Sequence, residues 1–120
     1  MFLISPDFKI ALFGSSGMAG GAILRALNRK GYFNLLLPNR KDLNLLNYID
    51  VKSWFRDYQP DVVIIAAAKV GGIYANDNYP ADFILENLKI QTNLIELAWK
   101  ENVKKLLFLG SSCIYPKYAK

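Results

Sequence analysis

The 120-residue chain has no histidine and only one cysteine, Cys113. Without histidine, no imidazole can act as a general base, and zinc sites built from cysteine and histidine are excluded. The sequence therefore predicts no metal site. A single cysteine also excludes an internal disulfide bond, and this favours a reducing compartment. We accordingly expect a cytoplasmic protein.

Long apolar runs are also missing. None approaches the roughly 20 residues that a membrane-spanning helix needs. The first ten residues lack a basic segment and a small-residue cleavage site, so we expect neither a signal peptide nor a membrane partner. With 52% hydrophobic and 21% charged residues, the composition is typical of one soluble globular domain.

The net charge is +5, and its basic residues cluster only mildly. Such clusters usually mark solvated helix ends. The functional alternative is a small ligand that carries phosphate. Nucleic acid is not expected as a partner, because no basic stripe is interleaved with aromatic residues.

Apolar runs and helical periodicities alternate along the chain. We expect strands at 9–13, 35–37, 61–66 and 105–109, and none shows the polar alternation of a half-exposed sheet. We expect helices after Gly17, from an Asp50 cap to Tyr58, and from Pro80 to about Lys100. The sequence thus predicts an α/β fold, a Rossmann-type doubly wound parallel sheet that is incomplete, with about four strands and three helices. The expected helix stripes are Met18, Ala22, Ile23, Ala26 and Leu27; Val51, Trp54 and Phe55; and Phe83, Ile84, Leu88, Leu94, Ile95 and Ala98.

Three glycines follow the first predicted strand in FGSSGMAGGAI. In a dinucleotide site the first would make the tight turn, the second would admit the pyrophosphate, and the third would let helix pack on strand. The phosphates would then bind free N–H groups at the helix amino terminus. The alternative is a turn whose small residues serve packing alone. We favour the dinucleotide site because further strand–helix units follow.

The residues after the second strand bear on the choice of cofactor. An acidic residue there would bind the ribose hydroxyl of NAD, but the chain reads Pro38-Asn39-Arg40-Lys41. Arg40 offers a planar cation for a 2′-phosphate, which favours NADP (as NADPH). Alternatively, the basic residues are merely solvated.

Four stretches of the sequence resemble the extended short-chain dehydrogenase/reductases. They are GSSGMAGGAI at 14–23, RKDLNLLN at 40–47, AAAKVGGIYANDNYPADFILENL at 66–88 and KLLFLGSSCIYPKYAK at 105–120. Within that family the chain is most similar to the GDP-L-fucose synthase branch. The resemblance implies an NADPH-dependent epimerase/reductase that converts GDP-4-keto-6-deoxy-D-mannose to GDP-L-fucose, and a homodimer when complete.

The resemblance also implies residue roles. Ser111 matches the catalytic serine, and Cys113 matches the thiol of the epimerisation step. Composition alone would make Cys113 a buried core residue. Its serine neighbours at a strand's carboxyl end instead favour a cleft. The cofactor-binding residues that the resemblance implies are Gly14, Ser15, Ser16, Gly17, Met18, Ala19, Gly20, Arg40, Asn44, Leu45, Leu109, Gly110, Ser111 and Ser112.

The sequence departs from the family pattern at two points. Ser16 stands where the family often has a basic residue. Neither Tyr115 nor Tyr118 has a lysine four residues later, the spacing that lets lysine lower a catalytic tyrosine's pKa. We therefore expect residues 1–120 to be the amino-terminal NADP-binding portion of a Rossmann domain, inactive alone, with the catalytic helix and substrate domain absent.

Two alternatives remain at this stage. The chain could be a non-catalytic NADP-binding module, although the retention of Ser111 and Cys113 argues against it. It could also belong to an epimerase or dehydratase that acts on another nucleotide sugar.

Overall fold

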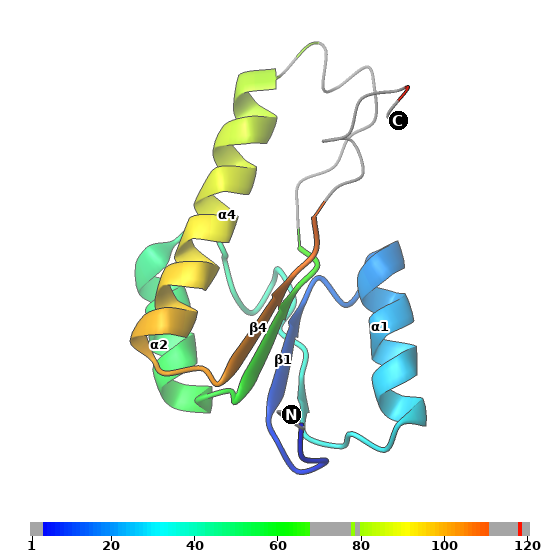
Figure 1. Cartoon of the computed structure of the whole chain (residues 1–120). Helices are drawn as coiled ribbons and strands as arrows, with labels where there is room; N and C mark the ends of the chain where they lie inside the picture. Colours follow the sequence, from blue (N-terminus) through cyan, green and yellow to red (C-terminus); the bar gives the residue numbers. More distant parts are fainter. Residues whose placement is uncertain (1–3, 68–77, 79, 111–117, 119–120) are drawn as a thin grey trace.

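A computed structural model describes residues 4–67, 78, 80–110 and 118. Over these residues it contains one four-stranded parallel sheet and three helices (Figure 1). This arrangement confirms the predicted α/β fold class. The strands lie in the order β2-β1-β3-β4. The elements are β1 Ile10–Phe13, α1 Met18–Arg29, β2 Leu35–Leu36, α2 Tyr48–Tyr58, β3 Val62–Ile65, α4 Pro80–Lys100 and β4 Lys105–Phe108.

The register aligns the ends of the three longer strands. Phe13 at the end of β1 pairs with Ile65 at the end of β3, and Ile65 pairs with Phe108 at the end of β4. The segments that follow these strands therefore leave the sheet along one edge, here called the carboxyl edge. Open α/β sheets bind their ligands at this edge.

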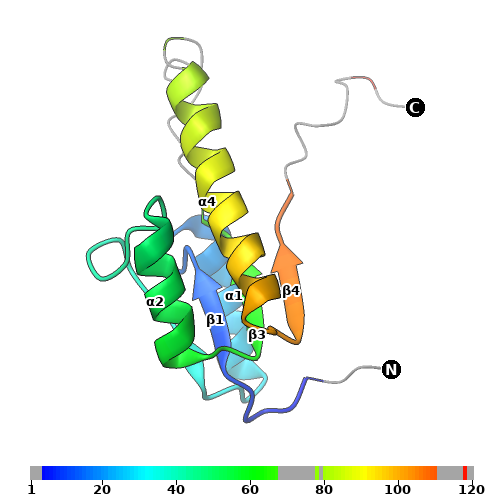
Figure 2. The same ribbon diagram turned by 90° about the vertical axis from the view of Figure 1, so that its left-hand side faces the viewer.

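Helices cover both faces of the sheet. Helix α1 packs on one face, and α2 and α4 pack on the other (Figures 1 and 2). Alternate strand residues serve the two sides: Ile10 and Leu12 belong to the core beneath α1, whereas Ala11 and Phe13 belong to the core beneath α2 and α4. All residues of β1 and β3 are buried, as their unbroken apolar runs predict.

Helix α2 presents its predicted apolar face to the sheet. Val51 and Phe55 are buried, and the Phe13 ring lies 5.3 Å from the Trp54 ring and 6.0 Å from the Phe55 ring between centroids. The predicted Asp50 cap is wrong. Helix α2 begins earlier, and Asn47 caps it by accepting the N–H of Ile49 at 3.0 Å and of Asp50 at 3.2 Å. An asparagine side chain can satisfy the free N–H groups of a first turn, so Asp50 lies inside the helix.

The predicted stripe of α4 is also partly wrong. Ile84, Leu88 and Ile95 are 61%, 51% and 41% exposed. The buried residues are Ile90, Leu94, Leu97 and Ala98, so this helix packs through its carboxyl-terminal half. Its amino-terminal turns extend past the sheet in Figure 2, and Ile84, Leu85 and Leu88 in these turns are each more than half exposed.

Three smaller predictions need correction. In α1, Met18 is 94% exposed, and the sheet-facing residues are Ile23, Leu24 and Leu27. Strand β2 ends at Leu36, the last of its residues paired with β1, and excludes Leu37, which is 39% exposed. Strand β4 is exposed throughout, since it forms the other outer edge.

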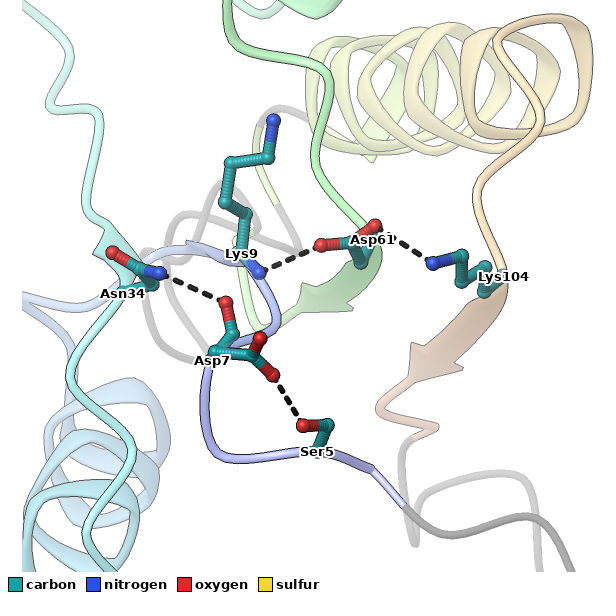
Figure 3. Close-up of polar contacts among 6 residues, drawn as sticks. All are labelled: Ser5, Asp7, Lys9, Asn34, Asp61 and Lys104. Carbon is teal, nitrogen blue, oxygen red and sulfur yellow. Dashed lines mark hydrogen bonds and ion pairs between the residues drawn. The ribbon is translucent and has the colours of Figure 1, made fainter.

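Polar groups tie the amino edge of the sheet together (Figure 3). Asp61 accepts the backbone N–H of Lys9 at 2.9 Å and pairs with Lys104 at 3.2 Å. The hydrogen bond from Lys9 holds the pKa of Asp61 below its usual value, with Lys104 adding to the effect and partial burial opposing it. These contacts link β1, β3 and β4 just before each strand begins.

No described helix combines the length and apolar character that crossing a membrane would require.

Candidate functional site

The turn after β1 requires glycine at two positions. Gly14 has a φ of +92°, and a Cβ there would lie 2.7 Å from the Ala66 carbonyl. At Gly20 a Cβ would lie 1.8 Å from the Gly14 oxygen. The turn is therefore closed against both β3 and the start of α1, which brings the amino terminus of α1 next to the sheet.

Gly17 differs from these two glycines. Its φ is −77°, and a Cβ would lie 3.5 Å from the Gly14 oxygen, an ordinary contact. It is the N-cap of α1 and provides no side-chain hydrogen bond to the first turn. The first N–H groups of a helix have no partner within the helix and carry partial positive charge. Internal packing leaves room for a side chain at Gly17, so a glycine there suits close approach of a ligand.

A cavity of about 200 Å³ opens beside this turn and is here called the glycine-loop cavity. Its only charged lining side chain among the described residues is Arg40, so its electrostatic character is positive. A larger cavity of about 600 Å³ lies between β2 and α2, but Asp42, Asp50 and Asp57 line it and would repel phosphate. The glycine-loop cavity is lined by Gly14, Ser15, Ser16, Gly17, Pro38, Asn39, Arg40, Leu43, Leu45, Ala66 and Ala67.

The loop that carries Arg40 is held by its own backbone. The Asn39 side-chain oxygen accepts the N–H groups of Lys41 and Asp42, each at 2.9 Å. The backbone carbonyl of Asn39 accepts the Leu43 N–H at 3.0 Å. Leu43 is 5% exposed and anchors the loop in the core. Arg40 itself forms no hydrogen bond or ion pair within the described part of the chain. Its guanidinium is thus held near the cavity by a rigid turn and is available to a ligand.

A neighbouring cavity of about 290 Å³, here called the α4 cavity, extends from Arg40 toward α4. The loop of residues 43–46, which lines this cavity, is attached to α4 because Asn93 Nδ2 donates to the Leu45 carbonyl at 2.9 Å. Asn44 Oδ1 accepts the Leu46 N–H at 3.1 Å. The residues that line the α4 cavity are Arg40, Leu43, Asn44, Leu45, Leu46, Ala67, Glu86 and Ile90.

The structure brings together some of the predicted cofactor residues and separates others. Ser15, Ser16, Arg40 and Leu45 line the glycine-loop cavity with the first two glycines, and Asn44 lines the α4 cavity. Leu109 and Gly110 follow β4 at the carboxyl edge and line neither cavity. In the first turn of α1, Met18 and Ala19 are exposed and Gly20 is buried. The predicted Ser111, Ser112 and Cys113 lie outside the described residues.

Sequence reasoning missed several lining residues. Asn39 was a detectable turn former, because asparagine often accepts backbone N–H groups two residues on. Ala66 and Ala67, two small residues after a buried strand, fit the close approach of Gly14. Glu86 and Ile90 gave no local signal, since they reach the site only through the packing of α4 against the 43–46 loop.

Among the described residues no cluster of potential metal ligands is present. A parallel sheet with a glycine turn at its carboxyl edge and a basic residue after the second strand defines a Rossmann-type nucleotide-binding protein. The chain belongs to the NAD dependent epimerase/dehydratase family, whose model matches residues 10–120.

Two similar relatives are GDP-L-fucose synthases. The chain is 56% identical over 111 residues to GDP-L-fucose synthase 1 of Arabidopsis thaliana, covering 92% of this chain and 34% of that one. It is 51% identical over 112 residues to GDP-L-fucose synthase of Escherichia coli, covering 93% and 35%. These identities confirm the resemblance inferred from the sequence.

A solved structure agrees with these relatives. A GDP-mannoheptose C4 reductase from Campylobacter jejuni, determined with NADP bound, superimposes with a TM-score of 0.90 at 40% identity, covering 98% of this chain and 34% of that one. The chain thus spans about a third of the length of the relatives it matches.

Proposed function

We propose that this chain is the amino-terminal NADP-binding part of an epimerase/reductase that makes GDP-L-fucose from GDP-4-keto-6-deoxy-D-mannose. The observation that carries the proposal is the convergence of the glycine turn, the amino terminus of α1 and Arg40 on one cavity. The first two suit a pyrophosphate, and Arg40 suits a 2′-phosphate. The identity to two GDP-L-fucose synthases supports the substrate.

Each part of the cavity has a separate task in this proposal. The N–H groups at the start of α1 would bind the pyrophosphate, and Gly17 would admit it at close range. Arg40, held by the Asn39 turn, would orient the adenosine half. When bound, NADPH supplies the hydride for C4 of the sugar.

The NADP assignment is tested by calorimetry with 2′,5′-ADP and 5′-ADP. We expect the full-length protein to prefer 2′,5′-ADP, and Arg40→Ala to weaken its binding by about 1.5–3 kcal/mol, the scale of a charged hydrogen bond. Lys41→Ala is the matched control, because Lys41 is an exposed neighbour that lines neither cavity. Equal affinity for the two nucleotides, unchanged by Arg40→Ala, would refute the assignment.

We also propose roles for Ser111 and Cys113 in the complete enzyme. A free thiol has a pKa of about 8.5, close enough to neutrality for it to exchange a proton with carbon acids beside a ketone. Cys113 would act in this way at C3 and C5, and Ser111 would hold the C4 oxygen. Cys113→Ser should abolish deuterium uptake from solvent at C3 and C5 while NADPH binding persists. Unchanged uptake would remove Cys113 from the reaction.

A second candidate substrate has its own support. The Campylobacter jejuni structure at 40% identity is a reductase of GDP-mannoheptose. An enzyme of this branch with another GDP-sugar as substrate would use the same cofactor cavity. The test is to assay the full-length protein with GDP-4-keto-6-deoxy-D-mannose and with the 4-keto form of GDP-mannoheptose. The product that forms shows which of the two is the substrate.

The outer side of α4 is proposed as a homodimer interface of the complete protein. Trp99 is 74% exposed and Ile95 41% exposed, and both border the same surface hollow. Burying such side chains stabilises an assembly. Trp99→Glu should give monomers by light scattering, whereas a persisting dimer would exclude Trp99 from the interface.

A further inference from the structure

The α4 cavity and the glycine-loop cavity share part of their lining. Arg40, Leu43, Leu45 and Ala67 belong to both. In the proposed NADP site the pyrophosphate lies at the glycine turn and the 2′-phosphate lies at Arg40. The ribose that carries both groups must then lie at the boundary between the two cavities. The base attached to that ribose would enter the α4 cavity, because that cavity shares Arg40 and Leu45 with the glycine-loop cavity, whereas Arg40 does not line the cavity between β2 and α2.

The walls of the α4 cavity suit a flat heteroaromatic ring. Leucine, isoleucine and alanine side chains supply most of its lining, and Ile90 is 8% exposed. Apolar walls bind the faces of such a ring, whereas a few polar groups at its edge determine which ring is accepted. The polar side chains among the described lining residues are those of Arg40, Asn44 and Glu86.

The hydrogen bonds already made in the cavity limit what these groups can do. Asn44 Oδ1 accepts the Leu46 N–H at 3.1 Å, so the Asn44 amide offers its NH₂ group as a donor. The Leu45 carbonyl already accepts from Asn93 at 2.9 Å. Arg40 carries donors only. Glu86 supplies the only carboxylate among the described residues of this cavity, and a charged acceptor forms stronger hydrogen bonds than an amide oxygen.

Glu86 lies on the face of α4 that borders the cavity. It is half-buried, and it stands one helical turn before the buried Ile90, which lines the same cavity. Glu86 already has a partner in the structure, but a carboxylate has two oxygens and accepts several hydrogen bonds, so it can also bind a ligand. Its position on a helix tied to the 43–46 loop fixes it relative to the base.

We infer that Glu86 is a specificity-determining residue that selects adenine by accepting a hydrogen bond from its exocyclic amino group. Adenine presents a donor at C6 beside a ring-nitrogen acceptor, which matches a carboxylate acceptor beside the Asn44 donor. Hypoxanthine presents a carbonyl at C6, and this oxygen would face the carboxylate. The inference rests on the proposed NADP site and adds to it the reading of the base.

The test compares NADP⁺ with nicotinamide hypoxanthine dinucleotide phosphate, which differs only at the base. Calorimetry on the full-length wild-type protein should show a preference for NADP⁺ of about tenfold or more, the scale of one matched polar pair. Glu86→Gln should reduce the preference to about twofold, because an amide can accept from adenine or donate to hypoxanthine. Glu96→Gln is the matched control: it makes the same change on the same helix, at a residue paired with exposed Lys100 at 3.2 Å.

The outcomes distinguish a failure of this inference from a failure of the proposed function. The role of Glu86 would be supported if the wild type prefers NADP⁺, Glu86→Gln loses this preference and Glu96→Gln retains it. Equal wild-type affinities for the two dinucleotides would overturn that role. A preference for NADP⁺ that persists in Glu86→Gln would also overturn it. In both cases the proposed NADP site would remain. If the wild type binds neither nucleotide, both the inference and the proposed function fail.

Discussion

The two edges of the sheet use polar residues in opposite ways. At the amino edge, polar groups bond to one another across strands: Asp61 joins the backbone of Lys9 and the side chain of Lys104 (Figure 3). Nearby, Asn34 donates to the Asp7 carbonyl at 2.8 Å. At the carboxyl edge, Arg40 forms no such bond within the described part of the chain and borders two cavities.

This difference separates stability from binding. Polar groups that satisfy one another contribute to the folded state, since breaking one pair leaves the other group unpaired. At the carboxyl edge the loops are held by backbone hydrogen bonds, by asparagine side chains and by Leu43, and the guanidinium of Arg40 is left for a ligand. Substitutions at the amino edge should therefore change the free energy of unfolding, and most substitutions of cavity side chains should change ligand affinity.

The largest expected effect is at Gly20, which breaks this division because it lies at the carboxyl edge and yet determines stability. Gly20→Ala should lower the free energy of unfolding by about 3 kcal/mol or more, since its Cβ would lie 1.8 Å from the Gly14 oxygen and neither backbone can move freely. Urea unfolding monitored by circular dichroism measures the change.

Gly21→Ala is the matched control for Gly20. Its Cβ would lie 3.5 Å from the end of the flexible Arg25 side chain and 3.6 Å from the Ser15 oxygen, which are ordinary contacts. Alanine also favours the helix by up to about 1 kcal/mol. Gly21→Ala should therefore be neutral or stabilising. Similar losses in both variants would show that backbone crowding at Gly20 is not the cause.

The second-largest loss of stability is expected at Asp61, which lies at the amino edge. Asp61→Asn should reduce the free energy of unfolding at pH 7 by about 1.5–3 kcal/mol, the scale of hydrogen bonds to a charged group. The pKa of Asp61 is lowered in the folded state, so its carboxylate stabilises the fold above the unfolded-state pKa. That contribution is lost as the pH falls through the folded-state pKa.

The wild-type and Asp61→Asn proteins should thus converge in stability at low pH. Urea unfolding between pH 7 and pH 2 tests this convergence, and nucleotide affinity at pH 7 should be the same in both proteins. A stability difference that does not shrink in acid would show that the charge of Asp61 is not responsible. A loss of nucleotide affinity would couple the two edges.

The fold was predictable from the sequence where a local pattern carries it. Unbroken apolar runs identified β1 and β3, because both of their faces are covered. The spacing of Gly14 and Gly20 indicated a tight turn into a helix, and their contacts show why no side chain fits at either position. The helix face of Val51 and Phe55 followed from the 3.6-residue period.

Other features depend on tertiary packing that a local pattern does not encode. The stripe assigned to Ile84, Leu88 and Ile95 was wrong because apolar residues occur along all of α4 and on more than one side of it, while only one side of its later turns meets the sheet. The Asn47 cap was missed because Asp50 is an equally plausible cap by residue type. Glu86 could not be assigned to the site, since the Asn93–Leu45 bond that brings α4 to the loop joins residues 48 positions apart.

The smallest expected effect distinguishes the two partners of Asp61. The Lys104 side chain is 51% exposed, and such ion pairs contribute at most about 1 kcal/mol. Lys104→Met removes both the ion pair with Asp61 and the ammonium group that lies 4.5 Å from the centroid of the Phe8 ring, so it should lower the free energy of unfolding by about 1 kcal/mol in all. The difference in free energy of unfolding between the wild type and Lys104→Met should decrease in high salt, because salt screens exposed charges.

The decisive measurement in Lys104→Met is the pKa of Asp61, followed by the NMR shift of its carboxyl carbon during acid titration. The backbone N–H of Lys9 is the main cause of the lowered pKa, and the substitution leaves it in place. The pKa of Asp61 should therefore rise only part of the way toward its usual value. Complete recovery would assign the effect to Lys104. The amino edge would then be held by an exposed ion pair, and the contrast with the carboxyl edge would weaken.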